Sequence, residues 1–371
     1  MRELAYPIIV CGTELSGKTA LCLGLFQKFQ EIGLRVGYFK PIGFGLKTVE
    51  GRLVDPDTVT MKEVLSLKES LEVITPIVLG RWYLELLSDE RQRLVERVVE
   101  AYGELSRGKD LVIVEGPPRP ETLTCMGCDV PRLSRELDAK VLFVVKGSGD
   151  EIVEEAVLYK KFIEGGGGEL MGVIINFVPR QVIERVRGVL LPTLKRCGIE
   201  SLGAVPDKKE LSLPSVEDLV RELNAEVLAG REHLDRLVEG FLVGAMTPES
   251  ALNWLRRGAG SALITGGDRT DLILTALEAD MSVLVLTGNL YPSLSVLTRA
   301  EEKGIPIVLV PQDTYTTVRR LEEISGRISP TPSSLKKIRL TRDIVGEYVD
   351  WRRIVEDYAE WKRRKRGSSS T

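Results

Sequence analysis

Short, almost entirely apolar runs recur along the chain, and each is followed by a turn and then by a stretch with helical spacing. The first of these runs lie at 5–10, 35–39, 111–114, 141–145 and 172–175. Their apolar residues fill consecutive positions instead of alternating with polar ones, which is typical of parallel strands covered on both faces. The alternation of strands and helices therefore predicts an α/β fold with a doubly wound, mainly parallel sheet.

A second series of strands and helices begins near residue 216. We place the boundary between the two domains in the stretch 206–215, which carries two prolines and a run of charge. The sequence thus predicts a first domain at 1–215 and a second, smaller α/β domain at 216–330. The strands expected in the second domain are at 242–243, 262–264, 283–286 and 307–310, and its expected helices are at about 248–257, 270–279, 293–303 and 314–324.

The last segment, 331–371, differs in composition from the rest. The spacing of its apolar residues at about 341–361 predicts an amphipathic C-terminal helix, which packs on its parent domain or on a second subunit. Five basic residues at 362–366, followed by Gly and Ser, predict a solvated, disordered tail, with nucleic-acid contact as the alternative.

The overall charge balance argues against nucleic acid as the main partner. The 371 residues include 51 Lys and Arg and 54 Asp and Glu, a formal net charge of −3. The five cysteines are few and odd in number, which favours a reducing compartment over a disulfide framework. His233 is the one histidine, so a Ser-His or Cys-His catalytic pair is not expected. Because no apolar run reaches the ~18 residues of a membrane span, we expect a cytoplasmic protein.

The strongest chemical signal is the segment Gly12-Thr13-Glu14-Leu15-Ser16-Gly17-Lys18-Thr19. It fits the pattern G-x-x-x-x-G-K-[ST] and stands between a predicted strand and a predicted helix, the context that this phosphate-binding loop requires. Its glycines let backbone N–H groups surround an anion, and the helix start adds partial positive charge. We therefore predict that Gly12 to Ala20 bind a nucleoside triphosphate, with Lys18 on the β and γ phosphates and Thr19 on Mg²⁺.

Four more charged residues are candidates for the same site. Glu115 ends a buried strand, where ligands collect in open α/β sheets, and is either a Mg²⁺ ligand or a cap. Lys40 also ends a strand; it lies over the phosphates or an acidic second substrate, or it is a surface lysine held by a turn. Asp55 and Asp57 flank Pro56 and are either Mg²⁺ ligands or part of a plain Asx turn.

These residues, taken together, resemble dethiobiotin synthetase and the nucleotide-binding amino-terminal domain of phosphotransacetylases. The resemblance covers the first ~215 residues and implies ATP and Mg²⁺ as ligands and a homodimer or higher homo-oligomer. The matching segments, in chain order, are Gly12–Thr19, Tyr38–Ile42, Asp55–Asp57, Val114–Gly116, Leu137–Leu142, Gly172–Asn176 and Leu202–Pro206.

The resemblance also implies roles for individual residues. Thr19, Asp57 and Glu115 are the implied metal ligands. Asn176 is the implied reader of the base edge, and Pro206, which ends the Gly-x-x-Pro segment, is also an implied nucleotide-binding residue. Lys18, Lys40 and Glu115 are the implied catalytic residues, with Lys40 facing the reacting group. The chain departs from dethiobiotin synthetase after Glu115, where Gly116-Pro117-Pro118-Arg119-Pro120 replaces a small glycine-rich loop. The diamine-binding surface is therefore not carried over.

Residues 216–330 resemble the DRTGG domain, which lies between the nucleotide-binding and catalytic parts of phosphotransacetylases. The resemblance depends on 262–271 and 285–289. Within the first of these, Gly266 to Thr270 suit a helix cap or, with Arg269 as a clamp, a small anion. The acetyltransferase catalytic domain of that family has no counterpart in this sequence, so we expect no acetyl transfer by this chain.

Cys125 and Cys128 form a lone C-x-x-C in the loop after Glu115. They are incidental loop thiols, a redox sensor, or half of a metal site shared across a dimer. For the whole chain, the first hypothesis is a Mg²⁺·ATP-binding regulatory protein that senses a metabolite and hydrolyses ATP slowly or conditionally. The alternatives are an ATP-dependent ligase or carboxylase, acting on a small acidic substrate through an acyl-phosphate, and a scaffold without turnover.

Overall fold

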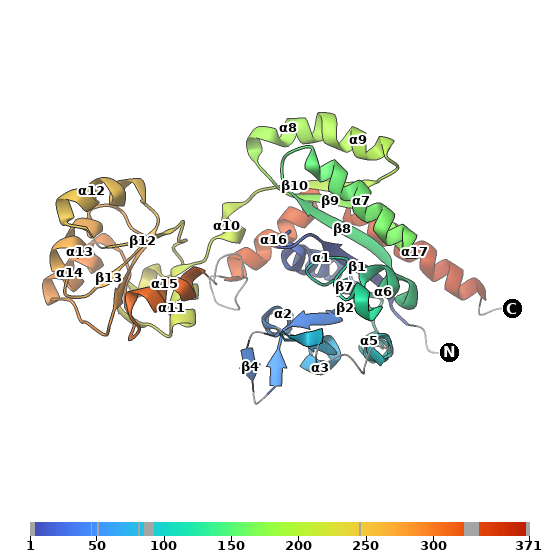
Figure 1. The fold of residues 1–371 in the computed structure, drawn as a ribbon, viewed down its shortest axis with the longest axis horizontal. Helices are drawn as coiled ribbons and strands as arrows, with labels where there is room; N and C mark the ends of the chain where they lie inside the picture. The colour runs from blue at the N-terminus through green and yellow to red at the C-terminus, as the bar shows by residue number, and fades with distance from the viewer. Residues whose placement is uncertain are drawn as a thin grey trace. The chain divides into compact units, whose positions relative to one another are not determined.

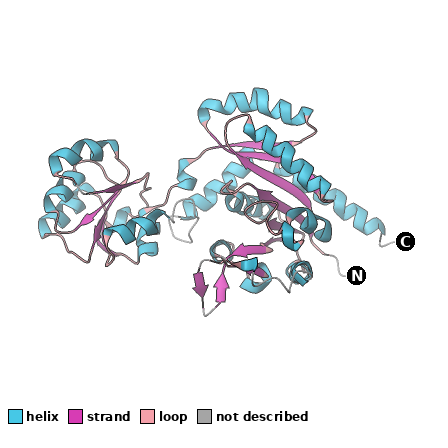
Figure 2. Ribbon diagram, viewed as in Figure 1, coloured by secondary structure: helices cyan, strands magenta, loops and turns pink. Residues whose placement is uncertain are grey.

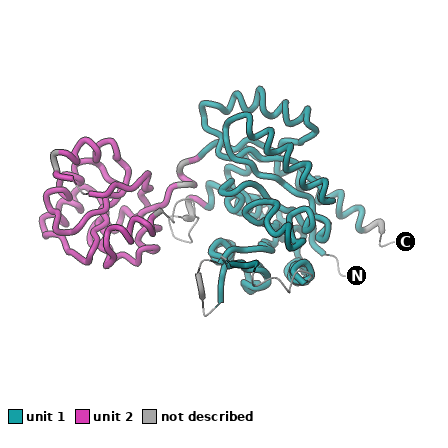
Figure 3. The backbone as a smooth tube through the Cα atoms, in the orientation of Figure 1, with its two compact units in different colours: residues 1–207, 338–371 teal, residues 208–337 magenta. Residues whose placement is uncertain are grey.

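The chain forms two compact units, which Figure 3 colours separately. The first unit consists of residues 1–207 and 338–371, and the second unit of residues 208–337. Both come from a computed structural model, which describes residues 4–45, 47–49, 52–80, 82–84, 93–244, 246–322 and 334–368. Each unit contains a sheet with helices packed around it (Figure 2).

The first unit is built on a six-stranded sheet whose paired neighbours are all parallel (Figure 1). Its inner strands are buried along almost their whole length, because their side chains are apolar on both faces. This confirms the predicted α/β class with a mainly parallel sheet. In order across the sheet, the strands are β10 (Ser201–Pro206), β9 (Glu169–Val178), β8 (Lys140–Lys146), β1 (Tyr6–Gly12), β7 (Leu111–Glu115) and β2 (Val36–Phe39).

Helices and two small sheets surround this sheet. The small sheets pair β3 (Ile42–Phe44) with β6 (Ile77–Leu79) and β4 (Lys47–Val49) with β5 (Arg52–Val54). The helices before the second unit are α1 (Lys18–Glu31), α2 (Pro56–Val64), α3 (Leu71–Ile74), α5 (Arg93–Leu105), α6 (Val130–Leu137), α7 (Glu151–Gly165), α8 (Ile183–Arg185) and α9 (Leu191–Arg196).

The winding direction of the sheet changes at the end of β1. The chain leaves β1 through α1 toward β2, whereas it leaves β7 through α6 toward β8, on the opposite side of β1. Ligands bind in open α/β sheets where the winding direction changes in this way. The register sets Val10 opposite Glu115 and Gly12 opposite Val144, so the ends of three strands meet at this point.

The second unit carries a five-stranded sheet with its own apolar core. The expected strands and helices are present, but the sequence did not predict the antiparallel edge strand β11 or the helix before it. The strands in sheet order are β11 (Glu226–Ala229), β15 (Ile307–Leu309), β14 (Val283–Thr287), β13 (Ala262–Gly266) and β12 (Phe241–Val243). The helices are α10 (Lys209–Ser212), α11 (Val216–Leu223), α12 (Pro248–Arg257), α13 (Thr270–Leu277), α14 (Leu294–Lys303) and α15 (Thr314–Glu322).

The C-terminal segment differs from the single helix and disordered tail that the sequence predicts. It forms two helices, α16 (Ser334–Tyr348) and α17 (Trp351–Ser368), because the two residues between them join the edge of the first sheet. Val349 bridges Gly203, and the Asp350 N–H donates to the Leu202 carbonyl at 2.7 Å. The basic residues 362–366 continue α17 as helix, whereas residues 369–371 lie outside the described part. Within the described residues, no helix has the length and apolar character needed to cross a membrane.

Three buried thiols in the first unit are expected to lower its stability at alkaline pH. Burial raises the pKa of Cys11 and of Cys128 to about 12, and it raises the pKa of Cys22 well above its ordinary value. Thiols in the unfolded chain lose their protons near pH 8.5, so the folded chain holds more protons above that pH. The free energy of unfolding therefore decreases as the pH rises above about 8.5, by on the order of 1 kcal/mol per pH unit for each thiol.

Urea unfolding at pH 8, 9 and 10 measures this dependence. The double variant Cys11→Ala/Cys128→Ala is expected to show a shallower decrease than the unsubstituted chain over the same range. Equal slopes for the two proteins would contradict the assignment. Cys197→Ala serves as the control, because Cys197 is exposed.

Candidate functional site

The predicted phosphate loop lies between β1 and α1, as its sequence context requires. Gly17 precedes α1 with a φ of 84°, in the left-handed region that favours glycine. A Cβ atom there would lie 2.5 Å from Asn176 Nδ2, and one on Gly12 would lie 2.1 Å from the Val144 carbonyl oxygen. Both positions therefore exclude a side chain, and the backbone of the loop remains open to an anion.

Lys18 is the first residue of α1, and its side chain folds back over the loop. The ammonium donates to the carbonyl oxygens of Thr13 at 2.8 Å and Pro118 at 3.1 Å. Burial lowers the pKa of Lys18, while the nearby Glu115 carboxylate opposes that shift. A buried cation with neutral carbonyls as its hydrogen-bond partners is a favourable counter-charge for a phosphate.

Two hydroxyl groups of the loop have no hydrogen-bond partner in the part of the chain that the structure describes. Thr13 Oγ1 and Ser16 Oγ are both buried, and neither forms a hydrogen bond within the described residues. A buried polar atom without a partner costs about 1–3 kcal/mol, so such atoms are rare in folded proteins. Phosphate oxygens would accept hydrogen bonds from both hydroxyls. The loop thus fits the anionic ligand that the sequence predicts.

Thr19 and Glu115, two of the predicted metal ligands, are brought together by the fold. Thr19 Oγ1 donates to Glu115 Oε1 at 2.9 Å, and Tyr38 donates to the other carboxylate oxygen at 2.9 Å. Burial raises the pKa of Glu115, and the Lys40 ammonium opposes the shift. The hydroxyl and the carboxylate are hard oxygen donors, the type of ligand that Mg²⁺ takes in proteins.

Lys40 is buried at the same place, which contradicts the alternative of a surface lysine. Its ammonium lies 2.9 Å from Asp57 Oδ2, 3.0 Å from Asp55 Oδ1 and 3.4 Å from Glu115 Oε1. Burial alone would lower the pKa of Lys40, but the three carboxylates outweigh it and raise this pKa. The lysine therefore stays charged in the folded chain.

The two aspartates flanking Pro56 have different environments. Asp55 is buried and caps α2, because its carboxylate accepts from the Thr58 N–H at 2.8 Å and also from the Phe44 N–H at 2.9 Å. The side chain of Asp57 is 44% exposed, and Lys40 is its ion-pair partner. Asp55 is thus a structural cap, whereas the metal-ligand role of Asp57 stays a prediction.

Asn176, the predicted base reader, lies against the phosphate loop. Its Nδ2 donates to the Ser16 carbonyl at 2.8 Å, and its Oδ1 accepts from the Phe177 N–H at 3.0 Å. The side chain is buried, so in this arrangement it supports the loop. Pro206 is the last residue of β10, the neighbour of the strand that carries Asn176. For both residues, contact with a base stays a prediction.

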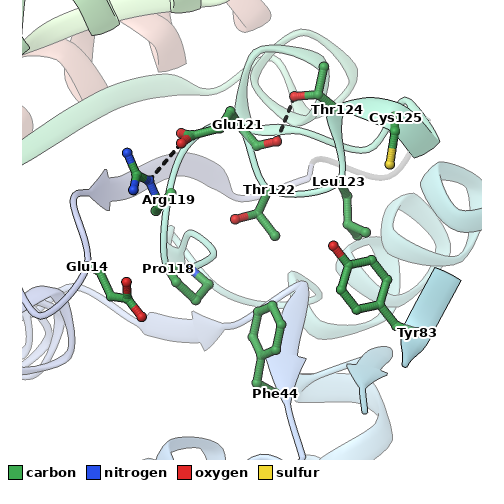
Figure 4. Close-up of a pocket in the computed structure, with 10 residues that line it drawn as sticks. All are labelled: Glu14, Phe44, Tyr83, Pro118, Arg119, Glu121, Thr122, Leu123, Thr124 and Cys125. Carbon is green, nitrogen blue, oxygen red and sulfur yellow. Dashed lines mark hydrogen bonds and ion pairs between the residues drawn. The ribbon is translucent and has the colours of Figure 1, made fainter. Parts of the chain in front are cut away.

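A cavity of about 680 Å³ lies next to the phosphate loop, and the sequence did not predict most of its lining. In Figure 4, Tyr83 and Leu123 lie on one side of it, and Glu14 and Arg119 on the other. Glu14, a residue of the phosphate loop, is the one lining residue that the sequence predicts as part of the site. The proline-rich segment after Glu115, which supplies Pro118 and Arg119, was the sequence signal for a further part of this lining. The lining residues are Glu14, Phe44, Tyr83, Pro118, Arg119, Glu121, Thr122, Leu123, Thr124 and Cys125.

The two cysteines of the C-x-x-C have different surroundings. Cys125 is exposed and lines the cavity, whereas Cys128 is buried and burial raises its pKa to about 12. A resolving thiol must reach the thiolate form, so the buried member is poorly suited to a redox pair. Among the residues that the structure describes, no group of three or more His, Cys, Asp and Glu side chains could hold a metal ion.

In the second unit, the segment before α13 lacks the side-chain cap that its sequence suggests. Arg269 stands at the cap position without a capping hydrogen bond, and its guanidinium donates instead to the Met246 carbonyl at 2.8 Å. The clamp for a small anion at Arg269 stays a prediction.

The parallel sheet and its loop define the first unit as a P-loop nucleotide-binding domain. The family model of the AAA domain matches residues 7–215, more than half of the chain, so the protein belongs to this AAA domain family. The model of the DRTGG domain matches residues 218–324. This arrangement confirms the resemblance to the amino-terminal region of phosphotransacetylases.

Curated relatives include phosphate acetyltransferases. That of Pseudomonas putida is 24% identical over 350 residues, which are 90% of this chain and 49% of the relative. That of Deinococcus radiodurans is 28% identical over 338 residues, which are 84% of this chain and 45% of the relative. The chain spans about half the length of the curated relatives it matches.

Two solved structures represent the structural neighbours. The septum site-determining protein MinD from Pyrococcus horikoshii, complexed with Mg-ADP, has 13% identity and a TM-score of 0.35, covering 56% of this chain and 83% of that chain. The CBS and DRTGG domains of Clostridium perfringens pyrophosphatase, complexed with the activator diadenosine tetraphosphate, have 20% identity and a TM-score of 0.28. The match covers 38% of this chain and 61% of the pyrophosphatase chain.

Proposed function

We propose that this protein binds Mg²⁺·ATP at the loop 12–20 and acts as a regulatory, metabolite-sensing ATPase with slow or conditional hydrolysis. The observation that carries the proposal is the hydrogen bond between Thr19 and Glu115 beside the unpartnered hydroxyls of Thr13 and Ser16. This arrangement combines two oxygen ligands suited to Mg²⁺ with two hydroxyl groups suited to phosphate, beside the ends of β1 and β7.

Each part of the site has a role in this proposal. Lys18 neutralises charge on the β and γ phosphates, and the backbone of Gly12 to Ala20 surrounds them. Thr19, Asp57 and Glu115 would hold Mg²⁺, which supplies charge neutralisation and orientation at the phosphates when it is bound. Asn176 and Pro206 belong to the base side of the site.

The surroundings of Glu115 favour regulation over rapid turnover. Hydrolysis requires a group that positions the attacking water. Both oxygens of Glu115 already accept hydrogen bonds, from Thr19 and from Tyr38, and Lys40 holds the neighbouring aspartates. We therefore infer that rapid ATP hydrolysis requires a metabolite signal, and that the separate DRTGG unit binds this metabolite.

Purified protein with ATP and Mg²⁺ tests the proposal. Isothermal titration is expected to show ATP binding that strengthens with Mg²⁺, and ADP release is expected to be slow in the absence of other substrates. The preference for ATP over GTP depends on the predicted role of Asn176, so a parallel titration with GTP belongs to the same experiment. Absence of binding to either nucleotide would reject the proposal.

A second candidate is an ATP-dependent ligase or carboxylase, and the cavity of Figure 4 favours it. The cavity is joined to the site by Glu14 of the loop and by Pro118, whose carbonyl accepts from Lys18. A substrate carboxylate there would attack the γ-phosphorus, giving an acyl-phosphate and ADP. An amine would then displace inorganic phosphate and form an amide. ADP release stimulated by one carboxylate from a pool would support this candidate over the regulatory one.

Cys125 offers a direct measure of whether the cavity takes a ligand. A small acid that binds there is expected to slow alkylation of Cys125 by iodoacetamide. A ligand in such a cavity is mostly buried, so it also covers the side chains that line the cavity, including Cys125. The exposed Cys197 is the internal control in the same chain, since it is not among the cavity residues. Peptide mass spectrometry follows both thiols. If no acid of the pool lowers the alkylation rate of Cys125 relative to that of Cys197, the cavity is excluded as an acceptor site.

A cytoplasmic location and a homodimer or higher homo-oligomer remain part of this proposal. Nucleic acid and membranes are not proposed as partners. Light scattering of the purified chain, with and without ATP and Mg²⁺, tests the oligomeric state.

A further inference from the structure

The arrangement around Lys40 consists of one ammonium among three carboxylates. Its Nζ lies within 3.4 Å of oxygens from Asp55, Asp57 and Glu115. The side chains of Lys40, Asp55 and Glu115 are only 7%, 4% and 3% exposed, so three of the four groups are shielded from water. Charges in such surroundings interact far more strongly than on the surface.

One carboxylate oxygen is shared between Lys40 and the proposed metal site. Glu115 Oε1 accepts from Thr19 at 2.9 Å and lies 3.4 Å from the Lys40 ammonium. Asp57, another proposed metal ligand, directs its Oδ2 to the same ammonium at 2.9 Å. The ammonium therefore lies among the oxygen donors that a divalent cation would use.

A divalent ion and this ammonium cannot share the same oxygens without strong repulsion. An added cation a few ångströms from a buried ammonium is strongly disfavoured, because like charges repel far more at the low dielectric of a protein interior than in water. The protein's own groups also do not form a complete metal site, in agreement with the absence of a three-ligand cluster among the described residues. The main chain of Lys40 is fixed by its N–H, which donates to Ile74 O at 2.9 Å, so the flexible side chain is the part that moves.

We infer that Lys40 is an internal counter-ion that keeps the divalent site closed in the nucleotide-free chain. The phosphates of a bound nucleotide attract the ammonium away from Asp57 and Glu115, and these oxygens then become available to the metal ion. The protein thus takes up its divalent ion together with the nucleotide and not before it. This inference rests on the proposed function, because it assigns the order of binding at the same site.

Mn²⁺ is the probe, because it uses the same carboxylate and hydroxyl oxygens as Mg²⁺ and its free ion is counted by electron paramagnetic resonance. The unsubstituted chain is expected to bind Mn²⁺ at least about tenfold more weakly without nucleotide than with a non-hydrolysable ATP analogue. Lys40→Met is expected to bind Mn²⁺ without nucleotide at least about tenfold more tightly than the unsubstituted chain. Adding Glu115→Gln to Lys40→Met removes this gain.

Two further variants separate the inference from a general effect of lost charge or lost stability. Lys109→Met is the matched control, since Lys109 pairs with Glu69 elsewhere in the unit and its loss leaves Mn²⁺ binding unchanged. Lys40→Gln, which keeps hydrogen-bond donors for the carboxylates, shows the same gain as Lys40→Met and serves where the Met variant does not fold.

Two outcomes overturn the inference. One is an unsubstituted chain that binds Mn²⁺ equally well with and without the analogue, and the other is a folded Lys40→Met or Lys40→Gln chain without any gain. Titration of the analogue alone distinguishes these from failure of the proposed function. If the chain binds the analogue and the Mn²⁺ result is negative, only the order of binding is rejected; if it does not bind the analogue, the proposed function itself fails.

Discussion

Replacing Lys18 with alanine is expected to abolish measurable ATP binding, with the dissociation constant raised at least about 100-fold, or about 2.7 kcal/mol. The ammonium is buried at the loop, where carbonyl oxygens of Thr13 and Pro118 are its hydrogen-bond partners. Its replacement removes the one cation of the loop 12–20, which we propose to bind the phosphates. A charge-assisted hydrogen bond in a buried site is worth about 1.5–3 kcal/mol.

Isothermal titration with ATP and Mg²⁺ measures this loss, and Lys160→Ala is the matched control. Lys160 lies on α7 and pairs with Glu164 one turn away, so its removal changes charge but not the loop. The control is expected to bind ATP as the unsubstituted chain does. Retained affinity in a folded Lys18→Ala chain would show that the triphosphate binds elsewhere.

The second large effect is expected at Asp357, in the C-terminal helix α17. This carboxylate is buried and accepts hydrogen bonds from the Tyr6 hydroxyl of β1 and, at 2.7 Å, from the Lys140 ammonium of β8. Asp357→Ala leaves the Tyr6 hydroxyl without its acceptor and removes the buried one of the two carboxylates that pair with Lys140, the other being the exposed Glu169 at 2.8 Å. We expect the free energy of unfolding to fall by about 3 kcal/mol, near the low end for a broken buried ion pair because Lys140 is partly exposed.

Urea unfolding of the whole chain, followed by fluorescence, tests the Asp357 variant against Glu356→Ala. Glu356 is the preceding residue of the same helix, and its exposed ion pair with Arg353 has a length of 3.6 Å. An exposed pair of this kind contributes at most about 1 kcal/mol, so the control should change little. Equal effects at the two neighbouring positions would mean that the contact of α17 with the first sheet does not stabilise the unit.

Much of the fold could be predicted because its signals are local. The strand Leu111–Glu115 and its neighbours are marked by consecutive apolar residues, and the phosphate loop is eight contiguous residues with a helix behind them. Periodicity within a dozen residues decides such elements. The same holds for the strands and helices of the second unit from residue 241 onward, whose positions the sequence predicts to within a few residues.

Other features could not be predicted, because no local pattern encodes them. The edge strand Glu226–Ala229 is short and only partly buried, so it lacks the continuous apolar run of the inner strands. The break at Val349 and Asp350 depends on the edge of β10, which lies far away in the sequence. An apolar stripe indicates that a helix packs on something, but not on what.

The sequence alone determined the class of the fold, the phosphate loop and the likeness of its two parts to known families, since each depends on residues close together in the chain. The tertiary structure decided the rest. It placed Asp55 as a cap, set the Lys40 ammonium among three carboxylates, put Asn176 against the loop and tied α17 to the first strand. These contacts join residues that are separated in sequence, and the order and register of the strands, not any local pattern, bring them together.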